Sequence, residues 1–156
     1  MVDSFQVEIR PIESVIPYDK NPRLNDKAVD AVAASLQEFG FRQPIVVDGE
    51  GIIICGHTRF LAAKKLGFSL VQVPVHTATD LTPEKTKAYR IADNKIGEIA
   101  EWDFEILPIE LTELQESGFD MTTFGFSEKE LTKLLIQFLF TVSCVTRLCR
   151  TIKTIF

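Results

Sequence analysis

Apolar and polar residues alternate along several stretches of the chain with the period of two expected of β-strands. A first strand is predicted at residues 7–11. Two runs rich in β-branched residues, 44–48 and 52–55, flank Gly49-Glu50-Gly51 and predict a hairpin. Another strand is predicted at residues 71–75. Its proline favours the edge of a sheet, because proline has no N–H to donate to a neighbouring strand.

Other stretches repeat apolar residues every three or four positions, which predicts helices. Asn25 can cap a first helix that stops at Gly40, and its apolar positions are Val29, Val32, Ala33, Leu36 and Phe39. Thr82 followed by Pro83 predicts the start of a helix of about four turns. Its periodic positions are Ala88, Ile91, Ala92, Lys95, Ile96 and Ile99.

The remaining pattern predicts a helical extension. Asp103 is expected to cap a helix that runs through Leu114, with Pro108 bending or splitting it. Ser127 and Glu130 have the spacing of a capping box that opens a last helix. Because strands and helices are intermixed, the chain is predicted to be α+β (a mixed α/β arrangement), with a small mixed sheet, flanking helices and this extension.

Composition divides the chain into three predicted segments. Residues 5–100 form the mixed domain and residues 101–137 form the helical extension. Residues 138–156 contain no carboxylate and are dominated by apolar residues, threonine, arginine and cysteine. This tail differs from the acidic, well-patterned sequence before it. Two interpretations stay open: a truncated or frame-altered tail, or a native one that covers a hydrophobic partner surface.

Length and charge narrow the function classes. The chain has 156 residues, 46% of them hydrophobic and 25% charged, as in an ordinary soluble domain. Its net charge of −5 argues against binding nucleic acid through an overall basic field. The longest apolar stretch, 134–145, is interrupted by Gln137 and is shorter than the ~20 residues of a spanning helix, so no membrane association is expected. The three cysteines lack zinc spacing, and no signal peptide opens the chain, so a cytoplasmic location is expected.

The junction after residue 55 carries the candidate chemistry. Gly56 lets the backbone turn tightly and approach a ligand, and the amides that follow open a helix whose positive end favours an anion. His57, Thr58 and Arg59 add a titratable group, a hydroxyl and a guanidinium suited to phosphate oxygens. The junction therefore predicts a phosphate-binding turn, and the alternative is an ordinary strand-to-helix turn with an exposed arginine.

Four short motifs follow one another in a recognisable order. They are Asn21-Pro22-Arg23, Gly40-Phe41-Arg42-Gln43-Pro44, Gly56-His57-Thr58-Arg59 and Ala92-Asp93-Asn94-Lys95. Together they resemble the N-terminal domain of the ParB/sulfiredoxin superfamily over residues 5 to about 100. The continuation through Trp102 looks most like the branch of phages, plasmids and mobile elements, where the domain often precedes a DNA methyltransferase. The glycine loop and catalytic motif of such an enzyme do not occur here, so methylation is not expected of this chain.

The resemblance implies a nucleoside di- or triphosphate as ligand. It implies that Gly40 and Gln43 line the base or ribose side and that Gly56, His57, Thr58 and Arg59 hold phosphates. Asp93 and Asn94 look similar to the Glu-Asn pair of ParB proteins that approaches phosphates and Mg²⁺, so a magnesium ion is expected near these two residues. Partition proteins carry Gly-Glu-Arg-Arg where this chain has Gly-His-Thr-Arg, which puts CTP-driven clamp closure in doubt.

The sequence leaves open whether the chain catalyses a reaction on a bound ligand. His57 and Asp93 are the candidate catalytic residues. The sulfiredoxin cysteine aligns with His57 rather than with Cys55, which is expected to be a small buried residue, so sulfinic-acid reduction is disfavoured. In the first helical turn His57 is expected to be neutral, since the helix dipole lowers its pKa.

Three functions are therefore weighed. The first is a ParB-like nucleotide-binding domain with a DNA-associated role in partition, regulation or DNA modification. It would meet DNA through a partner or a missing downstream module, with a homodimer as one assembly. The second is an enzyme on the same fold: a slow NTPase, a nuclease or a small-molecule kinase. The third is a non-catalytic protein-interaction fragment.

Overall fold

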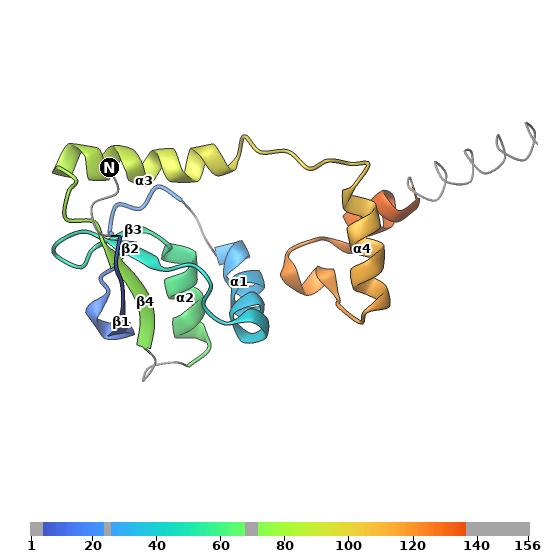
Figure 1. The fold of residues 1–156 in the computed structure, drawn as a ribbon, viewed down its shortest axis with the longest axis horizontal. Helices are drawn as coiled ribbons and strands as arrows, with labels where there is room; N and C mark the ends of the chain where they lie inside the picture. Colours follow the sequence, from blue (N-terminus) through green and yellow to red (C-terminus); the bar gives the residue numbers. More distant parts are fainter. Residues whose placement is uncertain (1–4, 24–25, 68–71, 137–156) are drawn as a thin grey trace, which may run out of the picture. The chain divides into compact units, whose positions relative to one another are not determined.

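A four-stranded mixed sheet organises the N-terminal part of the chain (Figure 1). The computed structural model describes residues 5–23, 26–67 and 72–136. It divides the chain into two units, Met1–Ala100 (unit 1) and Glu101–Phe156 (unit 2). The sheet belongs to unit 1 and has the order β1-β4-β2-β3. The strands are β1 (Val7–Pro11), β2 (Ile45–Val47), β3 (Ile53–Cys55) and β4 (Gln72–Thr77).

Strands β2 and β3 form the predicted hairpin. They pair antiparallel, and the Asp48 carboxylate closes the turn by accepting hydrogen bonds from the N–H groups of Glu50 at 3.0 Å and Ile52 at 2.9 Å. Gly51 has a φ of 83°, a left-handed conformation that glycine adopts without strain. The hairpin prediction is confirmed.

The position of β4 corrects the edge-strand prediction. β4 lies inside the sheet, antiparallel to β1 and parallel to β2. Pro74 is paired with Ile9 of β1, whereas pairing with β2 begins only at Val75. The proline therefore precedes the part of β4 that has a partner on both sides, and its missing N–H is tolerated there.

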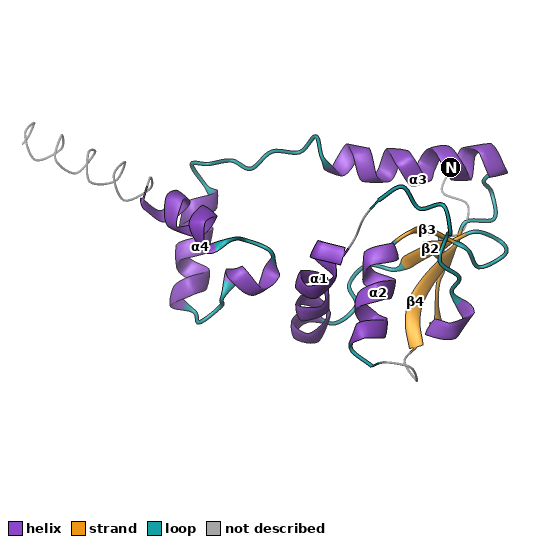
Figure 2. Ribbon diagram, turned by 180° about the vertical axis from the view of Figure 1, so that it is seen from behind, coloured by secondary structure: helices purple, strands orange, loops and turns teal. Residues whose placement is uncertain are grey.

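Three helices pack against the sheet: α1 (Asp26–Phe39), α2 (His57–Lys65) and α3 (Pro83–Gly97). Strand alternation sends Ile45, Val47 and Ile53 into one core with residues of α1 and α2. It sends Val46 and Ile54 to the other face, into a smaller cluster that also contains Cys55. The two clusters therefore lie on opposite faces of the sheet. Figures 1 and 2 show α1 beside α2, with α3 running past β3. The expected cap Asn25 lies outside the described residues.

Helix α3 starts as predicted but buries an unexpected face. The Thr82 hydroxyl accepts a hydrogen bond from the Lys85 N–H at 3.4 Å, and proline occupies the first turn. The buried residues of α3 are Thr86 and Arg90, whereas Ile91 and Ile96 are 55% and 65% exposed. The helix thus packs through polar residues that face the sheet.

Unit 2 contains α4 (Leu107–Glu116), a 3-10 turn (Met121–Phe124) and helical residues 128–136. The Asp103 carboxylate accepts hydrogen bonds from the N–H groups of Glu105 and Ile106, in a turn that precedes α4. Helix α4 therefore begins only at Leu107, with Pro108 in its first turn. The prediction that Pro108 bends or splits a helix is wrong, since proline is tolerated at that position. The capping box is confirmed: Ser127 Oγ accepts from the Glu130 N–H, and the Glu130 carboxylate accepts from the Ser127 N–H.

None of the helices that the structure describes has both the length and the apolar character required to cross a bilayer.

The difference in burial between two isoleucines of the sheet predicts how much stability is lost when each is replaced by alanine. Ile53→Ala removes a side chain that is 0% exposed and should lower the free energy of unfolding by about 2–5 kcal/mol. Ile9→Ala removes one that is 61% exposed and should change it by about 0.5 kcal/mol or less. Urea denaturation measures both, and equal losses would contradict this description of the core.

Candidate functional site

A cavity of about 220 Å³ opens where β3 meets α2. Its walls come from the loop after β1, from α1, from the β3–α2 junction and from α3. The lining residues are Asn21, Arg23, Val32, Cys55, Gly56, His57, Thr58, Arg59, Asp93 and Asn94. Three of the four motifs singled out in the sequence therefore contribute to one concave site.

The start of α2 faces this cavity with unpaired backbone donors. Gly56 precedes the helix with φ 104° and ψ 19°, and the Phe60 N–H donates to its carbonyl at 3.0 Å as the first bond of the helix. The N–H groups of His57, Thr58 and Arg59 therefore come before the helical hydrogen-bond ladder. Together with the positive end of the helix dipole, they form a local environment that favours an anion.

The side chain of Arg59 packs under Gly56. A Cβ on Gly56 would lie 3.1 Å from Arg59 Nη2 and 3.4 Å from the Ile45 Cα, so only glycine fits. Arg59 Nη1 donates to Gln43 Oε1 at 2.9 Å and Nη2 donates to the Pro44 carbonyl at 3.1 Å. Its Nε is buried and, among the described residues, has no hydrogen-bond partner. Burial lowers the pKa of Arg59, while nearby Cys55 and Asp93 act in the opposite direction.

His57 is held as a neutral imidazole. Its Nε2 accepts the Tyr18 N–H at 3.2 Å, so the proton of the neutral ring is on Nδ1. Burial, followed by the charge of Arg90, lowers the pKa of His57 to about 4. The sequence argument also gave a neutral ring but attributed it to the helix dipole. In the structure, burial is the largest cause of the lowered pKa, and the charge of Arg90 is the second.

Arg90 is the main functional residue that the sequence reasoning missed. Its side chain is buried, its Nε donates to the Ile53 carbonyl at 3.2 Å, and its guanidinium carbon lies 3.7 Å from the centroid of the Tyr18 ring. It thus ties α3 to β3 and fixes the loop that holds His57. The available signal was its position next to Asp93 within the last motif, but one sequence does not reveal that this arginine is buried.

The first motif also reaches the site. Arg23 Nη1 donates to Asn94 Oδ1 at 2.9 Å and lies 4.0 Å from the Glu98 carboxylate. The Asn94 amide donates to the Arg90 carbonyl at 2.8 Å, which orients its side chain. Asn21 and Arg23 line the cavity, although neither was among the predicted site residues.

Cys55 and Asp93 meet on the wall of the cavity. Burial, and then a hydrogen bond to Asp93, raise the pKa of Cys55 to about 12. The thiol therefore stays protonated and donates to the carboxylate. Cys55 is 6% exposed, which confirms the interpretation of a small buried residue.

Two predicted site residues stand apart from the others. Gly40 follows the end of α1, where its N–H donates to the Leu36 carbonyl at 3.0 Å, and it is not among the residues lining the cavity. Gln43 is connected to the site only through Arg59. Asp93 is the one carboxylate of the lining, and the described residues contain no cluster of three or more His, Cys, Asp or Glu that could hold a metal ion.

The fold and this strand-to-helix junction define a small α+β domain with a candidate anion site, and comparison with known proteins identifies its family. Residues 2–94 match the ParB N-terminal domain, and residues 105–142 match the ParB-methyltransferase HTH domain. Since the first match covers more than half of the chain, the protein belongs to the ParB N-terminal domain family. The superfamily resemblance and the predicted fold class are thereby confirmed.

Individual relatives agree with this assignment. The chain is 33% identical over 86 residues to the ParB-like nuclease domain-containing protein YnaK of Escherichia coli K12, covering 54% of this chain and 97% of that protein. It is 33% identical over 81 residues to a nucleoid occlusion protein of Bacillus cereus strain B4264, covering 48% of this chain but 28% of that protein. Among solved structures, the C-terminally truncated ParB of Caulobacter crescentus complexed with CTP-gamma-S aligns with a TM-score of 0.65 and 22% identity, over 83% of this chain and 77% of that one. The similarity to the Caulobacter structure shows that the two proteins share a fold.

The close approach at Gly56 predicts a large effect of adding one methyl group. Gly56→Ala places a Cβ against Arg59 and β2 at a positive φ and should cost about 1–3 kcal/mol of stability. Gly49→Ala is the matched control, because a Cβ there meets nothing within 4 Å. Thermal or urea unfolding compares the two variants, and equal stability would argue against the tight junction.

The neutral state of His57 predicts a pH dependence. Its folded pKa of about 4 lies below the ordinary 6.5, so between these values the unfolded chain binds the extra proton. Stability should therefore fall as the pH drops from 6.5 to 4, and His57→Gln should reduce this slope. His76→Gln, which changes the only other histidine, is the control. Denaturation at a series of pH values measures the slope, and an unchanged slope in His57→Gln would contradict the assignment.

Proposed function

We propose that unit 1 binds the phosphates of a nucleoside di- or triphosphate and that the protein acts with DNA as a ParB-type regulatory, partition or DNA-modification component. The observation that carries this proposal is the convergence of backbone donors and charged side chains on one cavity. The open amides of α2 and the side chains of Arg23, Arg59 and Asn94 lie around it. This donor set suits phosphate oxygens better than it suits a neutral ligand.

Two features of Arg59 and His57 support phosphate as the ligand. The buried Nε of Arg59 has no hydrogen-bond partner among the described residues, and such an orphaned donor costs about 1–3 kcal/mol unless it is satisfied. Because this atom is closed off from solvent, a phosphate oxygen would satisfy it only if the Arg59 side chain turned towards the cavity. The Nδ1–H of neutral His57 supplies a further donor, because its Nε2 already accepts from Tyr18.

The size of the cavity bears on how the nucleotide would lie. About 220 Å³ is less than the roughly 300–1,000 Å³ of pockets that enclose a whole drug-sized ligand. The cavity therefore suits the phosphates, and the nucleoside would extend beyond it. Gln43, which accepts a hydrogen bond from Arg59, would then meet the base or ribose, as the family resemblance implies.

A magnesium ion fits this arrangement only together with the nucleotide. Asp93 is the single lining carboxylate, and Asn94 supplies an amide oxygen beside it. Mg²⁺ commonly binds through one or two carboxylates plus substrate phosphates and keeps several waters. Asp93 and Asn94 would then hold the ion against the phosphates, and the ion would neutralise phosphate charge.

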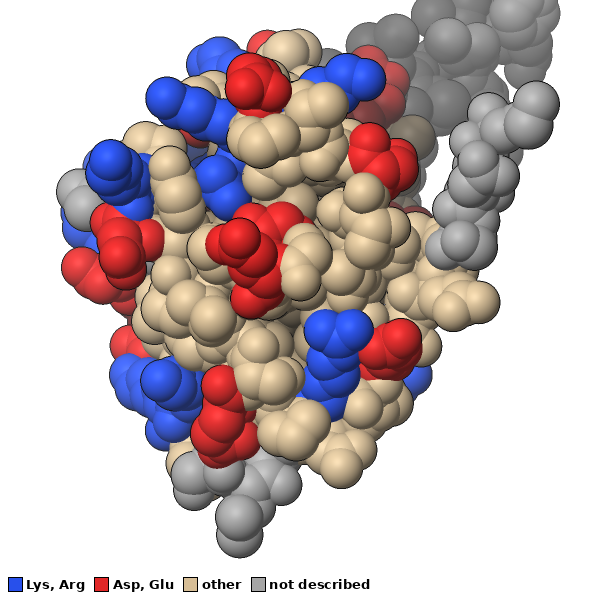
Figure 3. Space-filling model, turned by 90° about the vertical axis from the view of Figure 1, so that its left-hand side faces the viewer, with Lys and Arg blue, Asp and Glu red and all other residues tan. Residues whose placement is uncertain are grey.

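The relatives support the nucleotide and the link to DNA. The Caulobacter ParB structure contains CTP-gamma-S, and the Bacillus relative is a nucleoid occlusion protein. Basic and acidic side chains are interspersed on the face of the molecule in Figure 3. We assign contact with DNA to the segment that matches the ParB-methyltransferase HTH domain, to a partner or to a downstream module.

A thermal-shift screen of ATP, ADP, CTP and GTP, each with and without Mg²⁺, tests the proposal. A nucleotide at 100 times its dissociation constant should stabilise the chain by ~2.7 kcal/mol. Arg23→Ala and Arg59→Ala should abolish the shift, whereas Arg10→Ala should retain it, because Arg10 pairs with Glu8 on β1. If none of the four nucleotides shifts the transition, the interaction-fragment alternative is favoured.

The same samples address the enzymatic alternative. His57 and Asp93 both line the cavity, so slow hydrolysis of bound nucleotide is the second candidate. Phosphate release that needs Mg²⁺ and disappears in Asp93→Asn, with binding retained, would support it. Binding without turnover would leave a nucleotide-responsive switch.

A further inference from the structure

The Arg23 side chain is held at the unit 1 cavity through a single nitrogen. Its Nη1 donates to Asn94 Oδ1 at 2.9 Å, reaches the Asn94 carbonyl at 3.5 Å and lies 4.0 Å from the Glu98 carboxylate. Its Nε and Nη2 have no hydrogen-bond partner among the described residues. A guanidinium can hold a phosphate through two parallel bonds, so Arg23 has donors left for a stronger partner than Asn94.

The backbone that carries this side chain is fixed by Asn21. The Asn21 amide donates to the Arg23 carbonyl at 3.2 Å and accepts from the Arg23 N–H at 3.4 Å. The Asn21 N–H in turn donates to the Tyr18 carbonyl at 3.1 Å. Exchange of one partner of Arg23 for another therefore needs new side-chain torsions but no change in this turn.

The Asn94 side chain has one oxygen to offer a cation, and Arg23 occupies it. Asn94 Nδ2 donates to the Arg90 carbonyl at 2.8 Å, so Oδ1 is the end of the amide that faces Arg23. A divalent cation beside Asp93 would use the same oxygen. Because a guanidinium and a metal ion repel each other at close range, only one of them can take Asn94 Oδ1 at a time.

Glu98 adds a weak hold on Arg23 that is easily released. The side chains of Arg23 and Glu98 are 49% and 51% exposed, and exposed ion pairs contribute little to stability. The other oxygen of Glu98 accepts a hydrogen bond from Lys95 Nζ at 3.0 Å, so the carboxylate keeps a partner when Arg23 leaves. A phosphate therefore competes well for this guanidinium.

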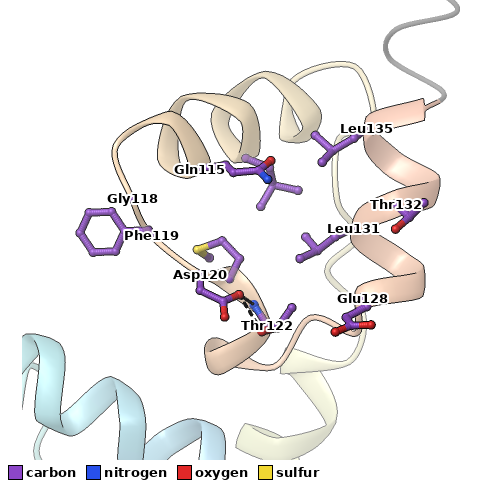
Figure 4. A pocket seen from close by; sticks show the side chains of 11 residues that line it. Gln115, Gly118, Phe119, Asp120, Thr122, Glu128, Leu131, Thr132 and Leu135 are labelled. Carbon is purple, nitrogen blue, oxygen red and sulfur yellow. Dashed lines mark hydrogen bonds between the residues drawn. The ribbon is translucent and has the colours of Figure 1, made fainter.

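The arginines at this cavity distinguish it from a hollow of about 450 Å³ in unit 2, shown in Figure 4. The charged residues that line that hollow are Asp120 and Glu128, and its lining residues include no lysine or arginine. Transfer of a guanidinium from protein to ligand is therefore open to the unit 1 cavity and not to this hollow.

We propose that Arg23 is a latch that couples phosphate binding to cation binding. The latch rests on the proposed nucleotide-binding function of unit 1. Without ligand, Arg23 covers Asn94 Oδ1. A bound phosphate draws the guanidinium away from Asn94 and Glu98, and the freed oxygen beside Asp93 becomes available to a divalent cation. Phosphate and cation then strengthen each other's binding by the same factor. Glu98 is a positioning residue that acts through Arg23 and lowers the affinity for phosphate.

Calorimetric titration of the 156-residue chain with CTP, ATP and inorganic tripolyphosphate tests the role of Glu98. Glu98→Gln should tighten binding by about two- to fivefold, because Arg23 no longer has to leave a carboxylate. A merely structural role of Glu98 would weaken binding instead. Glu101→Gln removes the same charge three positions further on and should leave the affinity unchanged, since the ion pair of Arg23 is with Glu98.

The side-chain amide of Asn94 reports on access of a cation. Mn²⁺ replaces Mg²⁺ in this measurement because it broadens the NMR signals of nearby groups. In Arg23→Ala, Mn²⁺ without phosphate should broaden the Asn94 amide signal at a several-fold lower concentration than in the wild type. Lys95→Gln is the control: it removes a neighbouring, 70% exposed positive charge but leaves Arg23 on Asn94, so it should behave as the wild type.

The outcomes separate the latch from nucleotide binding. If the wild type binds a ligand but Glu98→Gln binds no tighter, or Glu101→Gln tightens binding equally, the latch is contradicted and nucleotide binding stands. Equal broadening by Mn²⁺ in Arg23→Ala and the wild type, or in Arg23→Ala and Lys95→Gln, also contradicts the latch. If the wild type binds none of the three ligands, with or without Mg²⁺, the nucleotide-binding function fails and the latch fails with it.

Discussion

The buried guanidinium of Arg90 is the contact on which the geometry of the candidate site depends. Burying an ion costs several kcal/mol unless partners replace its water. Here the Ile53 carbonyl and the face of Tyr18 are those partners, and the carbonyl of Arg90 itself orients the amide of Asn94. Tyr18 in turn donates to His57. One residue of α3 thus couples β3, the loop after β1 and the first turn of α2.

Local patterns predicted the elements well because each depends on near neighbours. The hairpin follows from a glycine-containing turn between two β-branched runs, and the last helix follows from a capping box that spans four residues. The strand-to-helix turn at Gly56 could likewise be predicted, since Gly56 and the residues after it are contiguous, and phosphate binding there stays a proposal. The neutral state of His57 was also anticipated, and burial, followed by the charge of Arg90, lowers its pKa.

Features that depend on distant partners escaped the sequence argument. Pro74 lies in an inner strand because β1 and β2 pair on either side of β4, and no local signal specifies that order. Arg23 belongs to a motif that the sequence singled out, but its contact with Asn94, 71 positions away, appears only in three dimensions. Pro108 begins a helix instead of interrupting one because the turn at Asp103 delays the start of α4. For Pro74 and Arg23 the decisive contacts are distant in sequence, whereas the start of α4 at Leu107 is set by the local turn at Asp103.

The protonated thiol of Cys55 has a consequence for the chemistry open to this fold. A cysteine whose pKa is about 12 is almost entirely un-ionised at neutral pH, so it is a poor nucleophile and resists oxidation. It stands immediately before Gly56, on the sheet side of the turn, whereas the sulfiredoxin cysteine aligns with the position just after that glycine. Cys55 therefore serves as a packed, protonated side chain at the end of β3 rather than as a nucleophile.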